Sequence, residues 1–202
     1  MSSLKAELRG ETVPEFTLTI PGGWVRKDPT DQVRDEMLAA VKKRLMQAHR
    51  PDLYGQTTGM VRKLFSEMHR METIAFFGPG ENAPAQAYLP ATLTATVRRG
   101  ANGQSLDGPI AELIRNEGAT ALGDDKRFLR WGSSTVESLD GTRVATTTVL
   151  YLTPIPDAGR KRALQFTLII THNPDEPGDG DFVVGLTTLF DAYLSTFTWS
   201  AA

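Results

Sequence analysis

The chain has 202 residues and a formal net charge of −2, which argues against general nucleic-acid binding, because that function usually shows as a strongly basic balance or stripe. Apolar residues make up 40% and charged residues 23%, the mixture of a globular domain rather than of a disordered or collagenous chain. Since there are no cysteines, disulfides, thiolate metal sites and thiol nucleophiles are excluded.

The length suits one domain, which we expect over residues 15–202 after a polar lead-in over residues 1–14. The start of the chain has no apolar leader segment, and the densest apolar stretch, residues 163–171, is far too short to span a bilayer. We therefore expect a cytoplasmic protein without a membrane span. Its oligomeric state does not follow from the sequence.

The first half predicts a strand and two helices. Phe16, Leu18 and Ile20 alternate with threonines, which indicates a half-buried strand over residues 16–20, and Pro21-Gly22-Gly23 ends it. Asp31 is the expected N-cap of an amphipathic helix that stops before Pro51. A second helix runs to residue 71. The expected apolar positions are Val33, Met37, Val41, Leu45 and Ala48 in the first helix, and Met60, Leu64, Met68 and Met71, flanked by Val61 and Phe65, in the second.

The second half predicts a sheet and two further helices. Strands are expected over residues 72–78 and 89–99, the latter with nearly perfect alternation, followed by a short helix over residues 105–118. Residues 127–171 read as a meander with an Asp140-Gly141 hairpin turn. The last helix places Phe182, Leu186, Leu189 and Tyr193 at helical spacing, with Phe190 and Leu194 beside them. This order predicts an α+β domain whose mainly antiparallel sheet is packed by helices; the alternative is a helix-grip fold.

The two ends of this domain, "FTLTIPGGW" and "LFDAYLSTFTW", resemble the PsbP-like superfamily, which also includes the Ran-GTPase nucleotide-release factor and many actinobacterial domains. "YLPATLTATV" resembles the second strand block of that family. The resemblance implies an α/β/α sandwich that binds macromolecular partners or stabilises assemblies, without catalytic or cofactor-binding residues. Because a tryptophan buries roughly 150–250 Å², we expect the two indoles to close the rim of the sheet. The residues that carry the resemblance are Pro21, Gly22, Trp24, Ser195, Phe197 and Trp199.

The sequence predicts no catalytic, cofactor or metal site. The three histidines, His49, His69 and His172, lack zinc-site spacing. The acidic loop over residues 175–181 fails the calcium-loop pattern at the third and twelfth positions, so we expect a solvated loop in which Asp181 caps the last helix. No serine has a marked base and oxyanion donor. The loop carboxylates are Asp175, Glu176, Asp179 and Asp181.

The clearest functional signal is basic charge on the helix pair of an acidic chain. We expect a non-catalytic interaction or assembly-stabilising domain that binds a protein. The more specific version of this prediction is that the partner is acidic. The alternative is a carrier of a small apolar ligand in a cavity between sheet and helices, lined by Met60, Met68, Met71, Phe76 and Phe77. The candidate partner-binding residues are Lys42, Lys43, Arg44, Arg62 and Lys63.

Overall fold

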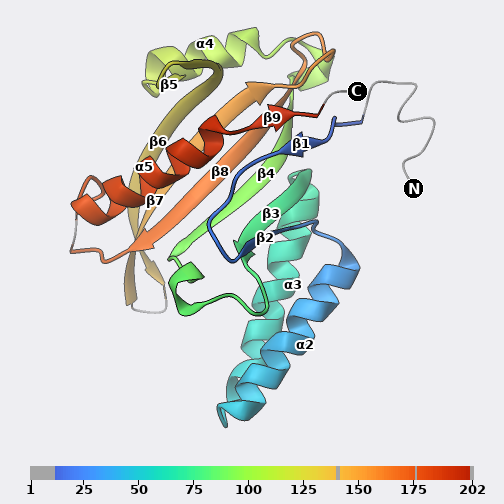
Figure 1. Ribbon diagram of the computed structural model, residues 1–202, viewed down its shortest axis with the longest axis vertical. Coiled ribbons are helices and arrows are strands. Elements are labelled where there is room, and N and C mark those ends of the chain that lie inside the picture. The colour runs from blue at the N-terminus through green and yellow to red at the C-terminus, as the bar shows by residue number, and fades with distance from the viewer. Residues whose placement is uncertain (1–11, 140–141, 176, 201–202) are drawn as a thin grey trace.

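A computed structural model describes residues 12–139, 142–175 and 177–200 of the chain (Figure 1). These residues form a seven-stranded antiparallel sheet in the order β2-β3-β4-β8-β7-β6-β5, a two-stranded sheet of β1 and β9, and four α-helices. The predicted α+β class is therefore confirmed. The strands are β1 (Phe16–Thr17), β2 (Trp24–Lys27), β3 (Thr73–Pro79), β4 (Ala91–Arg99), β5 (Thr120–Leu122), β6 (Asp125–Leu139), β7 (Thr142–Pro154), β8 (Arg162–His172) and β9 (Thr198–Trp199), and the helices are α2 (Asp31–Gln47), α3 (Tyr54–Arg70), α4 (Asp107–Asn116) and α5 (Asp181–Ser195).

The predicted meander is confirmed, because β6, β7 and β8 are consecutive neighbours in the sheet. Its last pair at the β6–β7 hairpin is Leu139 with Thr142; the predicted Asp140-Gly141 turn lies outside the described residues, as does most of the predicted lead-in. β8 then pairs with β4 along nine residues. The long alternating strands therefore form the centre of the sheet.

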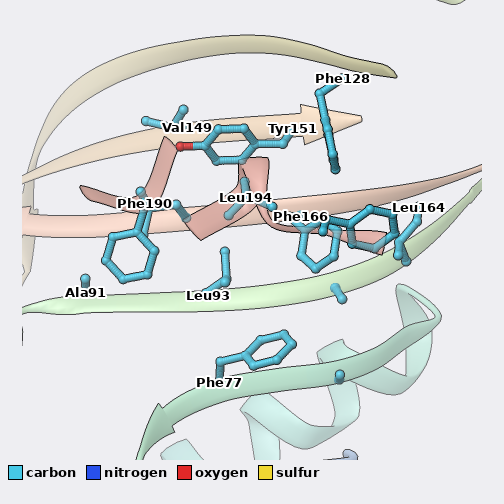
Figure 2. Close-up of a cluster of buried hydrophobic side chains, with 14 of the residues drawn as sticks. Phe77, Ala91, Leu93, Phe128, Val149, Tyr151, Leu164, Phe166, Phe190 and Leu194 are labelled. Carbon is cyan, nitrogen blue, oxygen red and sulfur yellow. The ribbon is translucent and has the colours of Figure 1, made fainter. Parts of the chain in front are cut away.

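One face of the sheet, here called the inner face, is covered by α5, which runs across β7 and β8 in Figure 1. Figure 2 shows Phe190 and Leu194 of this helix directed at the strands. Phe190, Leu194 and Phe166 have no exposed surface. A side chain of this size contributes roughly 1.5–3 kcal/mol when fully buried, so this face carries most of the stabilising burial.

The register of α5 differs from the prediction. Val183, Leu186, Phe190 and Leu194 are buried, whereas Phe182 and Leu189 are exposed. The predicted positions Leu186, Phe190 and Leu194 are therefore confirmed, but the buried stripe extends to Val183 instead of Phe182 and Leu189. Both arrangements contain enough apolar residues to satisfy the helical period, so the sequence pattern does not distinguish them. The N-cap is Gly180 without a side-chain bond, not Asp181. Asp181 is instead the first helical residue, where its charge complements the helix dipole.

The chain ends meet at β1 and β9, where Phe16 pairs with Trp199. The predicted strand over residues 16–20 is only two residues long and does not join the main sheet, because the chain turns at Pro21, whose carbonyl accepts the Trp24 N–H at 2.9 Å. Trp24 is buried as expected. Its indole Nε1 donates to the Ala87 carbonyl at 2.7 Å, which satisfies the one polar atom of the ring.

The opposite face of the sheet, here called the outer face, is covered by α3 and α4. Phe76 points to this face, since its neighbour Phe77 belongs to the core under α5 and successive strand residues alternate. Phe65 of α3 meets Phe76 edge to face at 5.9 Å. The predicted α3 stripe is partly wrong: Phe65 and Met68 are buried, but Met60, Leu64 and Met71 are exposed. Helices therefore lie on both faces of the sheet.

The start of α2 also differs by one residue from the prediction. Its N-cap is Thr30, whose hydroxyl oxygen accepts the Val33 N–H at 3.3 Å, and Asp31 is the first helical residue. Threonine and aspartate are both favoured N-caps, so the sequence pattern alone does not separate them.

Candidate functional site

The helices α2 and α3 form a hairpin that projects beyond the edge of the main sheet (Figure 1). The short 3-10 turn Pro51–Leu53 leads into α3, and His49 takes a left-handed backbone conformation, φ 53°, just after α2. A residue in this conformation commonly ends a helix. The turn therefore lets two 17-residue helices pack against each other and leaves the hairpin tip away from the sheet.

The half of the hairpin nearest its tip, residues 41–63 and here called the distal hairpin, is strongly basic. It contains six lysines and arginines but one acidic residue, Asp52. That aspartate is held by Arg50 at 3.0 Å, and the Arg50 side-chain hydrogen bond lowers the pKa of Asp52. Nearer the sheet, by contrast, Arg34 pairs with Asp31 and Asp35. Unbalanced positive charge is therefore concentrated towards the tip.

All five predicted partner-binding residues lie on the distal hairpin, and all are exposed. Among the described residues none of the five forms an ion pair; Lys42 places its ammonium 5.9 Å from the centre of the Tyr54 ring. At a rise of about 1.5 Å per residue, Arg44 lies ~5 Å from the end of α2 and Arg62 ~12 Å from the start of α3. The structure thus brings both sequence clusters to the same half of one projection.

Exposed apolar side chains accompany these charges. Met46, Met60 and Leu64 on the hairpin are 44%, 54% and 47% exposed. Single exposed apolar residues need no explanation, but here three stand among cations that have no ion pair within the described part of the chain. The distal hairpin therefore offers both charge and apolar contact to a partner surface.

The five residues predicted to line an apolar cavity do not come together. Phe76 and Phe77 point to opposite faces of the sheet, Met68 is buried, and Met60 and Met71 are exposed. Adjacent residues of one strand are unable to line a single cavity, because they alternate between faces. The carrier prediction fails at these positions.

A polar cluster missed by the sequence reasoning lies between β6, β7 and α5. Tyr151 donates its hydroxyl to Asp191 Oδ1 at 2.7 Å, and Arg130 Nε donates to the same oxygen at 2.9 Å. Burial, followed by the charge of Asp191, raises the pKa of Tyr151 well above its ordinary value, so the phenol stays protonated. The sequence hints at this cluster, because the charged residues Arg130 and Asp191 each stand next to a residue that faces the core.

Arg130 and Asp191 line a groove of about 580 Å³ between β6, β7 and α5, here called the groove under α5, and a second group of hydrogen-bonded polar residues lies along it. Ser134 and Thr147 share a hydroxyl hydrogen bond at 2.8 Å, and Thr147 lies 3.1 Å from His172 Nε2. Gly178 approaches this group so closely that a Cβ there would clash with the Ser134 side chain. Because Ser134 reaches the imidazole only through Thr147, the histidine is not placed to remove its proton directly.

Metal ligands do not gather in the part of the chain described here: within it no three His, Asp or Glu side chains are placed to hold an ion. Glu176 of the acidic loop lies outside that part. His69 donates to the Pro29 carbonyl at 2.5 Å, while His49 lies just after the end of α2. Across the described ranges every helix is too short or too polar to cross a bilayer.

No family model and no curated protein matches this chain. A solved structure from Bacteroides thetaiotaomicron VPI-5482 superposes on it with a TM-score of 0.43 and 11% sequence identity. The superposition covers 92% of this chain and 45% of that one, so the chain spans less than half the length of that structure. A likeness of this degree does not indicate a shared function.

Proposed function

We propose that this protein is a non-catalytic interaction domain that docks an acidic protein partner through the distal hairpin. The observation that carries this proposal is the contrast in charge pairing along one projection. In the half of the hairpin nearer the sheet, Arg34 and Arg70 are paired with carboxylates. The distal cations Lys42, Lys43, Arg44, Arg62 and Lys63, by contrast, are exposed without an ion pair in the described residues. Complementary charge of this kind favours encounter with an acidic surface and sets the orientation of docking.

Two further observations support a binding role. The polar groups of the groove under α5 are engaged with one another: Asp191 accepts from Tyr151 and Arg130, and Ser134 is bonded to Thr147. The Thr147 hydroxyl does contact His172, but it is also bonded to Ser134, and both Thr147 and His172 are buried. The PsbP-like assignment, which we also propose, is supported by the meeting of the two sequence ends that carry the resemblance, where Phe16 pairs with Trp199.

The proposal is tested with a fluorescent poly-glutamate peptide as a defined acidic probe. The variant Lys42→Glu/Lys43→Glu/Arg44→Glu is expected to weaken binding by about tenfold or more, and the wild-type affinity to fall steeply with salt. The variant Lys42→Gln/Lys43→Gln/Arg44→Gln removes the charge without placing carboxylates at the C-terminal end of α2, where they oppose the helix dipole. It should weaken binding while the melting temperature stays near wild type.

The matched control reverses three exposed cations elsewhere, Arg115→Glu/Arg143→Glu/Lys161→Glu, and changes the net charge by the same amount. It should retain most of the affinity. An equal loss in this control and in the Lys42→Glu/Lys43→Glu/Arg44→Glu variant would show that the peptide senses net charge only and would overturn the assignment to the distal hairpin. Tighter binding of a DNA duplex of equal charge than of the peptide would contradict a protein partner.

A further inference from the structure

The helix α4 covers an apolar part of the outer face without being buried itself. None of its residues is buried, Ile110 is half-buried, and Ile114 is 50% exposed. Beneath it Leu106, just before the helix, packs with Leu152 and Ala163 of the sheet. Since an amphipathic helix normally buries its apolar stripe against the body of a protein, this contact is incomplete.

The space left by this packing is a cavity of about 300 Å³ between α4, β5 with β6, and the ends of β7 and β8, here called the α4 cavity. Leu106, Leu129, Leu152 and Ala163 form its apolar floor. A second cavity of about 490 Å³ lies on the other side of the helix and shares Leu106, Ile110 and Leu152. Pockets of roughly 300–1,000 Å³ hold small molecules in proteins.

The lining of the α4 cavity is rich in cations. Lys126, Arg127, Arg160 and Arg162 line it, against one carboxylate, Asp107. Arg127 is held by Asp125 through hydrogen bonds of 2.7 and 2.9 Å. The contact of Arg160 with Asp107 is 3.5 Å long, and both side chains are more than half exposed. Such an exposed pair is weak, so the Arg160 guanidinium is available to another anion.

The backbone at Arg160 gives a second reason to assign a role to its side chain. Arg160 has φ 59°, a left-handed conformation that disfavours residues with a Cβ and suits glycine. Its carbonyl also accepts the Leu106 N–H at 2.9 Å, which ties this loop to the start of α4. Glycine would fit this backbone conformation better than arginine. The arginine side chain nevertheless places a cation at the cavity, which is the reason to assign it a role.

We propose that the α4 cavity binds an amphipathic anion, a carboxylate with a straight alkyl chain, whose chain lies on the apolar floor beneath α4 and whose carboxylate meets Arg160 and Lys126. The apolar floor accounts for the chain, and the excess of cations selects the sign of the head group. The site lies at the end of the molecule opposite the tip of the hairpin (Figure 1), so it is independent of the proposed partner surface.

Calorimetric titration of the full chain with decanoate, decanol and decyltrimethylammonium, all below their aggregation limits, tests the proposal. Decanoate should bind at one site, and the other two should bind at least about tenfold more weakly, as expected for the loss of a charge-assisted contact. Equal binding of decanol, or no binding of decanoate, would overturn the proposal.

Variants at Arg160 separate binding from folding. Arg160→Gly should lower decanoate affinity by about tenfold, while the melting temperature is unchanged or higher because glycine accepts the positive φ. Arg160→Lys keeps the charge and should retain most of the affinity. Unchanged affinity in Arg160→Gly would remove the assigned role of the guanidinium.

A cavity-filling variant and methyl resonances locate the ligand. Ala121 lines the cavity and is exposed, so Ala121→Phe should abolish decanoate binding, whereas Ala111→Phe, at an exposed position of α4 outside the lining, should not. In a sample with labelled isoleucine methyls, decanoate should shift Ile110 more than Ile114. The opposite order of shifts, or binding to Ala121→Phe as to wild type, would place the ligand elsewhere.

Discussion

The two ends of the molecule use similar residues in opposite shapes. The distal hairpin and the α4 end both combine exposed cations with apolar side chains, and they lie at opposite ends of the molecule (Figure 1). The hairpin is a projection, because α2 and α3 pack against each other. The α4 end is hollowed, because α4 lies alone on the sheet and leaves cavities on both sides. Shape therefore decides whether such a surface suits a macromolecule or a small ligand.

The largest effect should come from the core that both ends share. Phe190 is fully buried and meets Trp24 at 5.4 Å, so Phe190→Ala is expected to cost about 3–5 kcal/mol of unfolding free energy. Chemical denaturation measures the change. If α5 is the common support, binding of both poly-glutamate and decanoate should fall with the folded fraction; a loss below 1 kcal/mol would contradict this role.

A smaller and more local effect is expected where the hairpin joins the sheet. Phe65 is 1% exposed and contacts Phe76, so Phe65→Ala should cost about 3 kcal/mol, concentrated in α2 and α3. Hydrogen exchange should then accelerate in these two helices and stay near wild type in α4. Equal acceleration at both ends would show that they are not separately supported.

The corresponding change at the other end should be milder. Ile110 is only half-buried beside the α4 cavity, so Ile110→Ala should cost about 1 kcal/mol or less. Thermal melting checks the value, with Ile114→Ala as an exposed control. A cost comparable to that of Phe65→Ala would mean that α4 is packed more tightly than its burial indicates.

The smallest effect concerns pH at the α4 end. The side-chain hydrogen bond from Arg127 lowers the pKa of Asp125 in the folded protein. Stability from this pair is therefore present above the ordinary aspartate pKa and lost as the pH falls through the lowered value. Because Arg127 is 56% exposed, the contribution should be about 0.2–1 kcal/mol.

Melting curves of wild type and Asp125→Asn between neutral pH and about pH 2 measure this pair. The difference in stability between the two proteins should shrink as the pH falls. A difference that grows on acidification would contradict the sign of the pKa shift.

The sequence predicted elements well where one period extends over many residues. The alternation from residue 127 to residue 171 is long enough to define three neighbouring strands, and the hairpin helices were recognised from their spacing. Elements of two to four residues, namely β2, β5 and β9, were missed because such lengths contain no period. In α5 the spacing predicts Phe182 rather than Val183 in the buried stripe, because both are apolar and only packing distinguishes them.

The candidate sites were predictable to different degrees. The cations of the distal hairpin are clustered in the sequence, so their location could be inferred. The α4 cavity takes its residues from α4, β5, β6 and the ends of β7 and β8, and its lining depends on how α4 rests on the sheet. The Tyr151–Asp191 pair likewise joins residues 40 positions apart. Contacts of this range depend on strand order, which local patterns do not determine.

The most direct test is an amide NMR titration of one labelled sample, first with poly-glutamate and then with decanoate. The peptide should shift residues 41–63, decanoate should shift α4 and the residues around Arg160, and the two sets should not overlap. Peptide-induced shifts centred on α4 or on α5, with the hairpin unchanged, would contradict the assignment of partner binding to the distal hairpin.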